Sequence, residues 1–267
     1  MSHTLSAQRI AELDRLSPTQ VAIEVVAETG STNTDLLGRV GSLSVPTLLL
    51  AESQTQGRGR AGRSWLSASG ASLTFSLAWR FDGGVQALAG LPLAVGVAIA
   101  QALDVYDVHI ALKWPNDVLK DGNKLAGVLI ETAVDGDHVW AIIGIGLNLA
   151  LPDQLEAQIG QPAAEARWLA QLDRNALMAK LLDHLYQALV QFGETGFVAF
   201  VERWNVLHAH AGQMVSIVDA GRLLYQGLAV GVDEIGRLLL NTTVGRVAVV
   251  AGDVSLRAKE QEHAAID

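Results

Sequence analysis

The 267-residue chain contains no cysteine, which excludes disulfides, thiolate catalysis and zinc–thiolate sites. Its seven histidines are scattered along the chain, and only His208 and His210 lie close together. Because no neighbouring residue completes a ligand set for this pair, we expect no structural metal. The lack of cysteine is also compatible with a reducing cytoplasm, which is the expected location.

Charged residues are scarce too: they make up 18% of the chain, whereas half of the residues are hydrophobic. A sizeable core is therefore expected, and wholesale disorder is not. No uninterrupted apolar run reaches the ~20 residues that a membrane helix needs, and the N-terminus lacks the long apolar segment of a signal peptide. The formal net charge of -9 disfavours duplex nucleic acid, which demands a broad basic face. We expect a soluble protein that binds neither DNA nor a membrane.

Hydrophobic periodicity divides the chain into a mixed α and β part and an all-β part. Residues 7–16 form a short helical pattern, an Ala-rich buried helix has Pro92 in its first turn, residues 175–192 form an amphipathic helix, and a further helix is expected over residues 196–207. The predicted strands cover residues 21–27, 47–51, 72–79, 108–113, 117–120, 124–134 and 139–149, and then 214–218, 223–230, 238–240 and 247–250. The last four have a spacing of ~10 residues, which predicts a small barrel and a boundary near Ala211.

The most informative segment, residues 57–65, reads Gly-Arg-Gly-Arg-Ala-Gly-Arg-Ser-Trp. Clustered guanidinium groups repel one another and lose side-chain entropy when they are ordered, so such a cluster usually awaits an anion. The glycines allow backbone N–H groups to approach that anion closely. Binding of a phosphate or a carboxylate is the first hypothesis, and a solvated, flexible Arg/Gly loop is the alternative.

Two polar or glycine-containing motifs follow strands. Ser31, Thr32 and Asn33 could hydrogen bond a polar ligand, although capping of a helix is the better explanation of these residues alone. Gly144 and Gly146 end a hydrophobic strand, which they weaken unless another backbone or a ligand must come close. They lack the third glycine and the following helix of the dinucleotide fingerprint, so they are a weak signal.

Two lysine-containing motifs could bind anions. Residues 113–117 read Lys-Trp-Pro-Asn-Asp; Asp117 near a lysine could hold a ribose or a phosphate-bound metal, or Asn116 and Asp117 could bond their own backbone in a turn. Lys124 starts a buried strand, where it either extends to solvent, which is the usual case, or neutralises an anion in a pocket. No nucleophile elbow, Walker loop or paired-carboxylate motif is visible, so an enzyme of this sequence would act by positioning and charge neutralisation.

Taken in order, these motifs resemble those of the biotin protein ligases, also called biotin–[acetyl-CoA-carboxylase] ligases. The matching segments are residues 28–33, 54–65, 113–117, 124–127, 144–148 and 252–257. The resemblance implies an α+β fold in which a biotin/lipoate-ligase-like catalytic domain, with a mixed β-sheet and packed helices, covers residues 21–211. A helical extension, residues 1–20, would precede it, and a small SH3-like β-barrel, residues 212–267, would follow.

The resemblance also implies a two-step reaction. Biotin and MgATP give biotinyl-5′-adenylate and pyrophosphate, and the biotinyl group then passes to one lysine of a biotin carboxyl carrier domain of acetyl-CoA carboxylase. Because the carboxylate and the phosphates are both anionic, cations are needed where they meet. The residues implied in biotin binding are Ser31, Thr32, Asn33, Gln54, Gly57, Arg58, Gly59, Arg60, Lys124 and Gly127. Those implied in ATP binding are Arg60, Arg63, Trp65, Lys113, Asn116, Asp117, Lys124 and Asn148.

Within these sets, Lys124, Arg58 and Arg60 are the expected catalytic residues. Asp117 is the candidate metal ligand, through the Mg²⁺ that accompanies ATP. Ser64 stands where many relatives carry Lys, and Ala61 stands where some carry Arg. Both differences lower the positive charge of the loop.

Bifunctional relatives carry an N-terminal winged helix-turn-helix of ~60 residues, the size of a small domain. Here about 20 residues precede the first predicted strand, so the monofunctional type without repressor activity is expected. Two alternatives stay open: a lipoate or octanoate ligase with the same catalytic fold, and a non-catalytic biotin sensor. By analogy with relatives, a homodimer through the sheet edge near the Arg/Gly loop is also left open.

Overall fold

The computed structural model describes residues 4–14, 20–67, 69–150, 163–166, 168–219, 222–250 and 255–258. The helices are α1 (Ala7–Leu13), α2 (Thr32–Leu37), α3 (Leu91–Asp104), α5 (Arg174–Thr195) and α6 (Val201–Val206), with 3₁₀ turns at Val40–Ser42, Arg60–Gly62, Val85–Leu88, Leu169–Gln171 and Gly196–Phe200. The strands are β1 (Ala22–Thr29), β2 (Thr47–Gln54), β3 (Ser72–Asp82), β4 (Ala111–Lys113), β5 (Asp117–Lys120), β6 (Asn123–Asp135), β7 (His138–Asn148), β8 (Met214–Asp219), β9 (Arg222–Val232), β10 (Leu238–Thr242), β11 (Gly245–Val249) and β12 (Ser255–Ala258).

Three elements differ from the sequence predictions. The strand expected over residues 108–113 is shortened to β4, because the Val108 N–H donates to the Leu103 carbonyl and closes the end of α3. The helix expected over residues 196–207 is a 3₁₀ turn followed by α6, after Gly196 ends α5 with φ 66°. Strand β12 was not predicted, and residues 15, 16 and 252–254 of the predicted segments lie outside the described residues.

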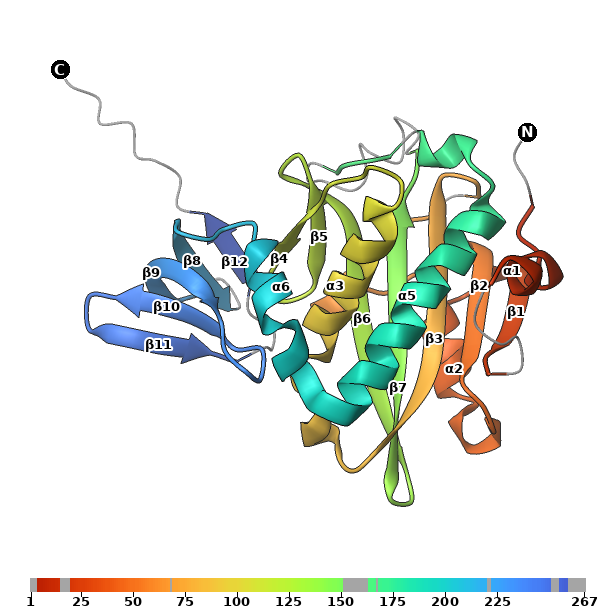
Figure 1. Ribbon diagram of the computed structural model, residues 1–267, viewed down its shortest axis with the longest axis horizontal. Coiled ribbons are helices and arrows are strands. Elements are labelled where there is room, and N and C mark those ends of the chain that lie inside the picture. Colours follow the sequence, from red (N-terminus) through yellow and green to blue (C-terminus); the bar gives the residue numbers. More distant parts are fainter. Residues whose placement is uncertain are drawn as a thin grey trace.

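A seven-stranded mixed sheet forms the larger part of the protein (Figure 1). Its strand order is β1-β2-β3-β7-β6-β5-β4, and only β1 and β2 run parallel. The long central strands β3, β7 and β6 are antiparallel, and β3 pairs with β7 along its whole length. Residues on one face of these strands therefore alternate strictly with residues on the other face.

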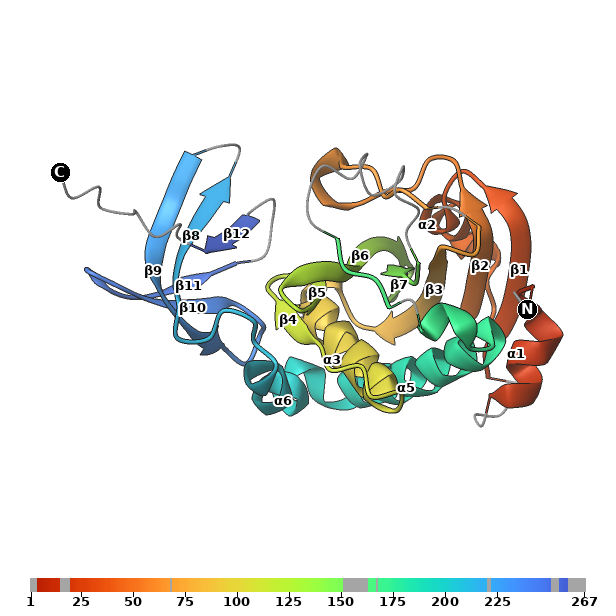
Figure 2. The same cartoon turned by 90° about the horizontal axis from the view of Figure 1, so that it is seen from above.

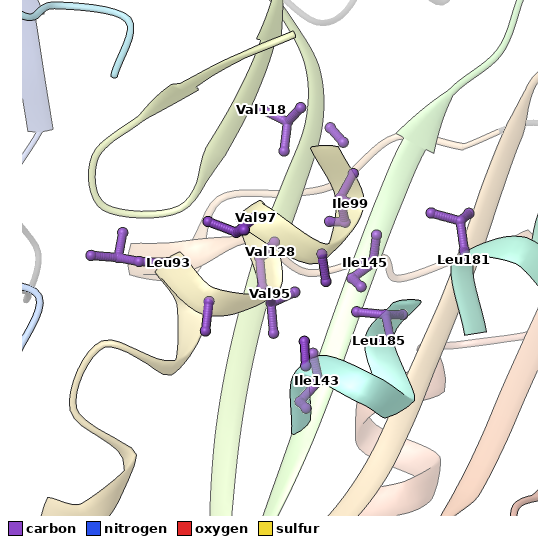
Figure 3. Packing of buried hydrophobic residues seen from close by; sticks show 14 of the residues in the cluster. Leu93, Val95, Val97, Ile99, Val118, Val128, Ile143, Ile145, Leu181 and Leu185 are labelled. Carbon is purple, nitrogen blue, oxygen red and sulfur yellow. The ribbon is translucent and has the colours of Figure 1, made fainter. Parts of the chain in front are cut away.

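Helices α3 and α5 lie side by side on one face of this sheet, whereas α2 covers the other face (Figures 1 and 2). Figure 3 shows Val95 of α3 and Leu185 of α5 beside Val128, Ile143 and Ile145 of the central strands, and all of these are buried. By length and composition alone, the segment Val85–Asp104 could cross a membrane. Because most residues of α3 are buried in this core, its apolar character is explained by packing.

The N-terminal segment is fixed to the end of β2 that carries the site residue Gln54. Arg174 at the start of α5 donates both terminal nitrogens to Glu52 of β2, at 2.8 and 2.9 Å, and the Leu5 N–H donates to the same carboxylate at 3.0 Å. Burial raises the pKa of Glu52, but the hydrogen bonds from Arg174 and the Leu5 N–H outweigh it, so the pKa is lowered overall. A partly buried, paired carboxylate thus holds three segments together.

The smaller sheet has the order β11-β10-β9-β8-β12 and is antiparallel. Its contacts with the larger part include two hydrogen bonds and a close packing of backbone. The Trp114 indole N–H donates to the Gly236 carbonyl at 3.0 Å, and the Val232 N–H donates to Asn205 Oδ1 at 2.9 Å. A Cβ atom at Gly236 would lie 2.8 Å from the Gly90 Cα, so this turn packs directly onto the start of α3.

Candidate active site

A cavity of about 630 Å³ lies on the α2 face of the large sheet. Its floor comes from neighbouring strands: Ser76 of β3 is opposite Gly144 of β7, which is opposite Leu129 of β6. In the next row, Gly146 of β7 is opposite Gly127 of β6. Directly opposed residues of antiparallel strands point to the same face. The three glycines therefore leave room on one surface for whatever lies above them.

The Asn33 side chain lies above Gly144. A Cβ atom at Gly144 would lie 2.3 Å from Asn33 Oδ1, so only glycine fits there without displacing the amide. Asn33 Nδ2 donates to a Glu131 carboxylate oxygen at 3.1 Å and lies 3.4 Å from the Leu129 carbonyl oxygen. The Ser76 hydroxyl donates to Asn33 Oδ1 at 2.6 Å. This explains Gly144: the group that comes close to it is the Asn33 side chain.

Thr32 and Gln54 extend the same hydrogen-bond network. Thr32 Oγ1 lies 2.6 Å from Ser76 Oγ, and the Thr32 N–H donates to Gln54 Oε1 at 2.8 Å. Ser31 occupies the N-cap position of α2 but makes no capping hydrogen bond with its side chain. Ser31, Thr32 and Asn33 are buried and line the cavity. Helix capping therefore does not account for the three polar side chains.

The Arg/Gly segment, residues 57–65, closes over the cavity with defined backbone hydrogen bonds. The Gly59 N–H donates to the Arg63 carbonyl at 2.7 Å, and the Trp65 N–H donates to the Gly57 carbonyl at 2.9 Å. A Cβ atom at Gly57 would lie 2.2 Å from the Trp65 carbonyl oxygen. This ladder contrasts with the alternative of an unstructured Arg/Gly loop.

The three arginines of this segment lie along the cavity. Arg58 forms an ion pair with Glu131 at 3.0 Å, although 49% of its side chain stays exposed. Arg60 donates to Asn116 Oδ1 at 3.1 Å, and Arg63 is exposed and donates from Nε to the Arg60 carbonyl at 3.2 Å. The three arginines thus line one cavity, and the side chains of Arg58 and Arg63 keep exposed surface, an arrangement that suits an anion.

Trp65 and Lys124 lie beside each other in the cavity. The Trp65 ring covers Gly146, where a Cβ atom would lie 2.2 Å from Trp65 Cε2. Lys124 Nζ lies 5.7 Å from the centre of this ring and 2.7 Å from Asp117 Oδ1. The buried Trp65 Nε1 has no hydrogen-bond partner among the residues that the structure describes.

Two asparagines brace the strands around Lys124. Asn116 Nδ2 donates to the Val128 carbonyl at 2.8 Å, which ties the end of β4 to β6. Asn148 Nδ2 donates to the Ala164 carbonyl at 3.2 Å, so it holds the segment after β7 against the cavity. Each carboxamide still lines the cavity.

One carboxylate at this end could contribute to binding the Mg²⁺ of ATP. Asp117 is partly buried and already holds Lys124. Within the described residues, no three side chains of His, Asp, Glu or Cys gather as a metal site. Mg²⁺ commonly takes one or two carboxylates together with substrate phosphates, and Asp117 fits that pattern as a single protein ligand.

The cavity brings most of the sequence-predicted site residues together. Those that line it are Ser31, Thr32, Asn33, Gln54, Arg58, Gly59, Arg60, Arg63, Trp65, Asn116, Lys124, Gly127 and Asn148. Three others do not line the cavity. Gly57 packs against the Trp65 backbone, Asp117 forms an ion pair with the lining residue Lys124, and Lys113 lies near His210. Burial lowers the pKa of His210, and the positive charge of Lys113 lowers it further.

Sequence reasoning missed several residues of the site. Ser76 and Glu131 complete the network around Asn33, and Phe75 and Leu66 add apolar surface. Ser76 lies in the predicted strand 72–79, whose partial polar alternation was a usable signal: a hydroxyl on a buried strand face needs a partner. Glu131 gave no signal, because its partners come from α2 and the Arg/Gly segment.

Comparison with known proteins supports the resemblance. Residues 25–148 match the Biotin/lipoate A/B protein ligase family, and residues 210–257 match the Biotin protein ligase C terminal domain. The Biotin--[acetyl-CoA-carboxylase] ligase of Mycobacterium tuberculosis is 36% identical, over 87% of this chain and 88% of the relative. The chain belongs to the biotin protein ligase family.

Two further relatives agree with this membership. The Bifunctional ligase/repressor BirA of Escherichia coli is 34% identical over 96% of this chain and 79% of its own length. The Biotin protein ligase from Aquifex aeolicus, solved in complex with biotin and ATP, has a TM-score of 0.75 and 30% identity, and covers 89% of this chain and 99% of its own. The expected α+β fold with a separate small C-terminal sheet is confirmed, and the chain is an enzyme of the biotin–[acetyl-CoA-carboxylase] ligase class.

Proposed function

We propose that this biotin protein ligase activates biotin with MgATP in the cavity above β3, β7 and β6, and then transfers biotin to a lysine of a carboxyl carrier domain. In the first step a biotin carboxylate oxygen attacks the α-phosphorus of ATP, and the bond to the departing pyrophosphate breaks. In the second step the carrier lysine amine attacks the acyl carbon, loses a proton and displaces AMP. The first step brings a carboxylate and a phosphate together, and the second releases AMP as an anion, so cations favour both steps.

The shape and polarity of the cavity support an extended ligand with one neutral polar end and one anionic end. Ser31, Thr32 and Gln54 lie at the polar end, where the ureido ring of biotin would bind. The Gly127 position and the Leu129 side chain would contact the aliphatic tail. Octanoate has no group that could bind at the polar end. The protein hydroxyl and amide groups there would gain no hydrogen bond from the ligand, which costs binding energy.

Lys124 is the residue on which the proposal depends most. Its ammonium group is held by Asp117 at 2.7 Å and by the Trp65 ring, inside the cavity that also contains the Arg/Gly segment. A cation fixed before the reaction stabilises the charge that develops between carboxylate and phosphate without reorganising. Arg58 and Arg60 would supply further N–H donors to the phosphates.

The nucleotide would lie toward Asn116 and Asn148, with Arg63 and Trp65 beside it. Mg²⁺ bound to ATP would neutralise phosphate charge, with Asp117 as its protein ligand. The domain boundaries near residues 20 and 211, a cytoplasmic location and the carrier domain as acceptor belong to the same proposal. The family membership supports the carrier domain as acceptor, and the small C-terminal sheet supports the boundary near residue 211.

The test is to incubate the purified protein with MgATP and, separately, with biotin, lipoate and octanoate, and to detect acyl-adenylates by mass spectrometry. We expect biotinyl-adenylate alone, and transfer of biotin to an added carrier domain. Lipoyl- or octanoyl-adenylate would keep the mechanism and overturn the substrate. Biotin binding without any adenylate would show a sensor instead of a ligase.

A further inference from the structure

A chain of short hydrogen bonds connects Thr32 at the cavity surface to Glu131 beneath the Arg/Gly segment. The consecutive distances are 2.6 Å from Thr32 Oγ1 to Ser76 Oγ, 2.6 Å from Ser76 Oγ to Asn33 Oδ1 and 3.1 Å from Asn33 Nδ2 to Glu131 Oε2. The first three residues are almost completely buried, and the Ser76 side chain has no exposed surface. Water therefore does not compete for these bonds.

The Glu131 end of this series of hydrogen bonds determines which way the Asn33 amide faces. Its Nδ2 atom lies beside two groups that only accept hydrogen bonds, the Glu131 carboxylate and the Leu129 carbonyl. A flipped amide would place Oδ1 against these oxygens and leave them without a donor. The amide oxygen must therefore face Ser76.

This orientation determines the direction of the other two bonds. A carboxamide oxygen cannot donate, so the single hydroxyl proton of Ser76 points to Asn33 Oδ1. Ser76 Oγ must then accept from Thr32, because two oxygens 2.6 Å apart without a proton between them repel each other. Two acceptors lie within reach of the Thr32 proton, Ser76 Oγ at 2.6 Å and Gln54 Oε1 at 3.1 Å. The shorter contact takes the proton, while Gln54 Oε1 accepts from the Thr32 backbone N–H at 2.8 Å.

Thr32 Oγ1 is left with lone pairs and no proton for the cavity. Asn33, by contrast, uses both its oxygen and its nitrogen inside the network. Glu131 also holds Arg58 with its second carboxylate oxygen at 3.0 Å, so the same side chain positions the Arg/Gly segment.

We propose that Ser76, Asn33 and Glu131 are positioning residues that make the Thr32 hydroxyl a hydrogen-bond acceptor, so that the cavity selects a ligand ring that carries an N–H donor. This inference rests on the proposed function and deepens it. A cyclic urea meets the requirement, whereas a dithiolane ring or an alkyl chain does not. Asn33 is thereby assigned a role in orientation instead of direct contact.

The test compares biotin with its two cyclic carbamate analogues, in each of which one ureido N–H is replaced by a ring oxygen of similar size. Isothermal titration gives the Kd of each ligand for the wild-type protein and for Ser76→Ala. In the wild type, one analogue should bind about 10- to 100-fold more weakly than biotin, since an unmet buried acceptor costs roughly 1–3 kcal/mol. In Ser76→Ala the Thr32 hydroxyl can turn and donate, so this ratio should fall to about threefold or less.

Ser72→Ala is the matched control, because Ser72 is a buried hydroxyl on the same strand that does not line the cavity. It should keep the wild-type ratio. Glu131→Gln retains an acceptor for Asn33 and should also keep the ratio, whereas Glu131→Leu should lose it. These two variants keep the proposal falsifiable if Ser76→Ala fails to fold.

The proposal is overturned if the wild type binds biotin and both carbamates equally well, or if Ser76→Ala and Glu131→Leu retain the full ratio. Failure of the wild type to bind biotin would instead overturn the proposed function itself. The two failures are distinguishable, because the first requires measurable biotin binding.

Discussion

The two ends of the cavity recognise their ligands by opposite means. At the polar end, Thr32, Asn33 and Ser76 are buried and hydrogen bonded before any ligand arrives. At the cationic end, half of the Arg58 side chain is exposed and Arg63 is exposed as well. A neutral ring attracts little from a distance and needs fixed partners, whereas phosphates are attracted by charges that can order on binding. The comparison teaches that the polar end provides selectivity and the cationic end provides charge neutralisation.

The largest effect is expected from removing the fixed cation. Lys124→Ala should reduce the rate of biotinyl-adenylate formation by about 10²- to 10³-fold, as for the loss of one preorganised electrostatic group. Biotin binding should fall less, because the polar end is unchanged. Single-turnover adenylate formation followed by mass spectrometry measures the rate. Lys120→Ala is the control, since Lys120 pairs with Asp121 outside the cavity; equal losses in the two variants would contradict the assignment.

A substitution at Gly144 should break the polar end alone. Gly144→Ala introduces a methyl group 2.3 Å from Asn33 Oδ1, which must move. Overpacking of this kind costs about 1–3 kcal/mol, so the Kd for biotin should rise roughly 10- to 100-fold. The KM for ATP should stay near its wild-type value. Gly41→Ala is the control, because nothing lies within 4 Å of a Cβ atom there; an unchanged biotin Kd in Gly144→Ala would refute the fixed network.

A substitution at His208, which lies between the large and the small sheet, should change the stability of the fold and not ligand binding. The His208 ring lies against the Trp204 ring, with 4.7 Å between the ring centres and a tilt of 35°, and burial, aided by the charge of His210, lowers the pKa of His208 to about 4. The unfolded state therefore takes up the proton first as the pH falls. Stability is full above about pH 6.5 and decreases toward pH 4, by about 2 kcal/mol between pH 7.5 and pH 5.

Denaturant unfolding at several pH values measures this loss. His208→Phe keeps an aromatic ring on Trp204 and should remove most of the pH dependence. The same substitution at exposed His109 should leave it in place. A slope that persists in His208→Phe would show that other groups cause it.

The smallest effect is expected at the exposed cation. Arg63→Ala should raise the KM for ATP roughly three- to tenfold at low ionic strength, with a smaller effect in high salt, because exposed charges are screened. Arg80 is an exposed arginine on β3 outside the cavity, so Arg80→Ala should change nothing. If Arg63→Ala raised the KM for ATP equally at low and high salt, Arg63 would not act as an exposed charge that orders when ATP binds.

The sequence predicted the cationic end better than the polar end. Arg58, Arg60 and Arg63 stand out as a cluster of positive charge in an acidic chain, and the structure brings them and Lys124 to one cavity. Their exact partners could not be predicted. The contact of Lys124 with Asp117 depends on the β5–β6 register, which contains a bulge.

The polar end depends on contacts between residues far apart in the chain. Ser76 and Asn33 are 43 residues apart, and Asn33 and Glu131 are 98 residues apart. Local patterns could not reveal that Gly144 must lack a side chain to admit Asn33. Most element positions followed hydrophobic periodicity, but the strand predicted over residues 108–113 was too long, because its first residues close α3. The strand order was not predicted. The absence of DNA binding, the homodimer and the exact domain bounds stay predictions.

The most direct test of the account is biotin-dependent exchange of labelled pyrophosphate into ATP, because this exchange reports reversible adenylate formation without any carrier protein. We predict exchange with biotin, none with lipoate or octanoate, and a loss of about 10²-fold or more in Lys124→Ala. A protein that binds biotin tightly yet supports no exchange would contradict the assignment of this cavity as the site of biotin activation.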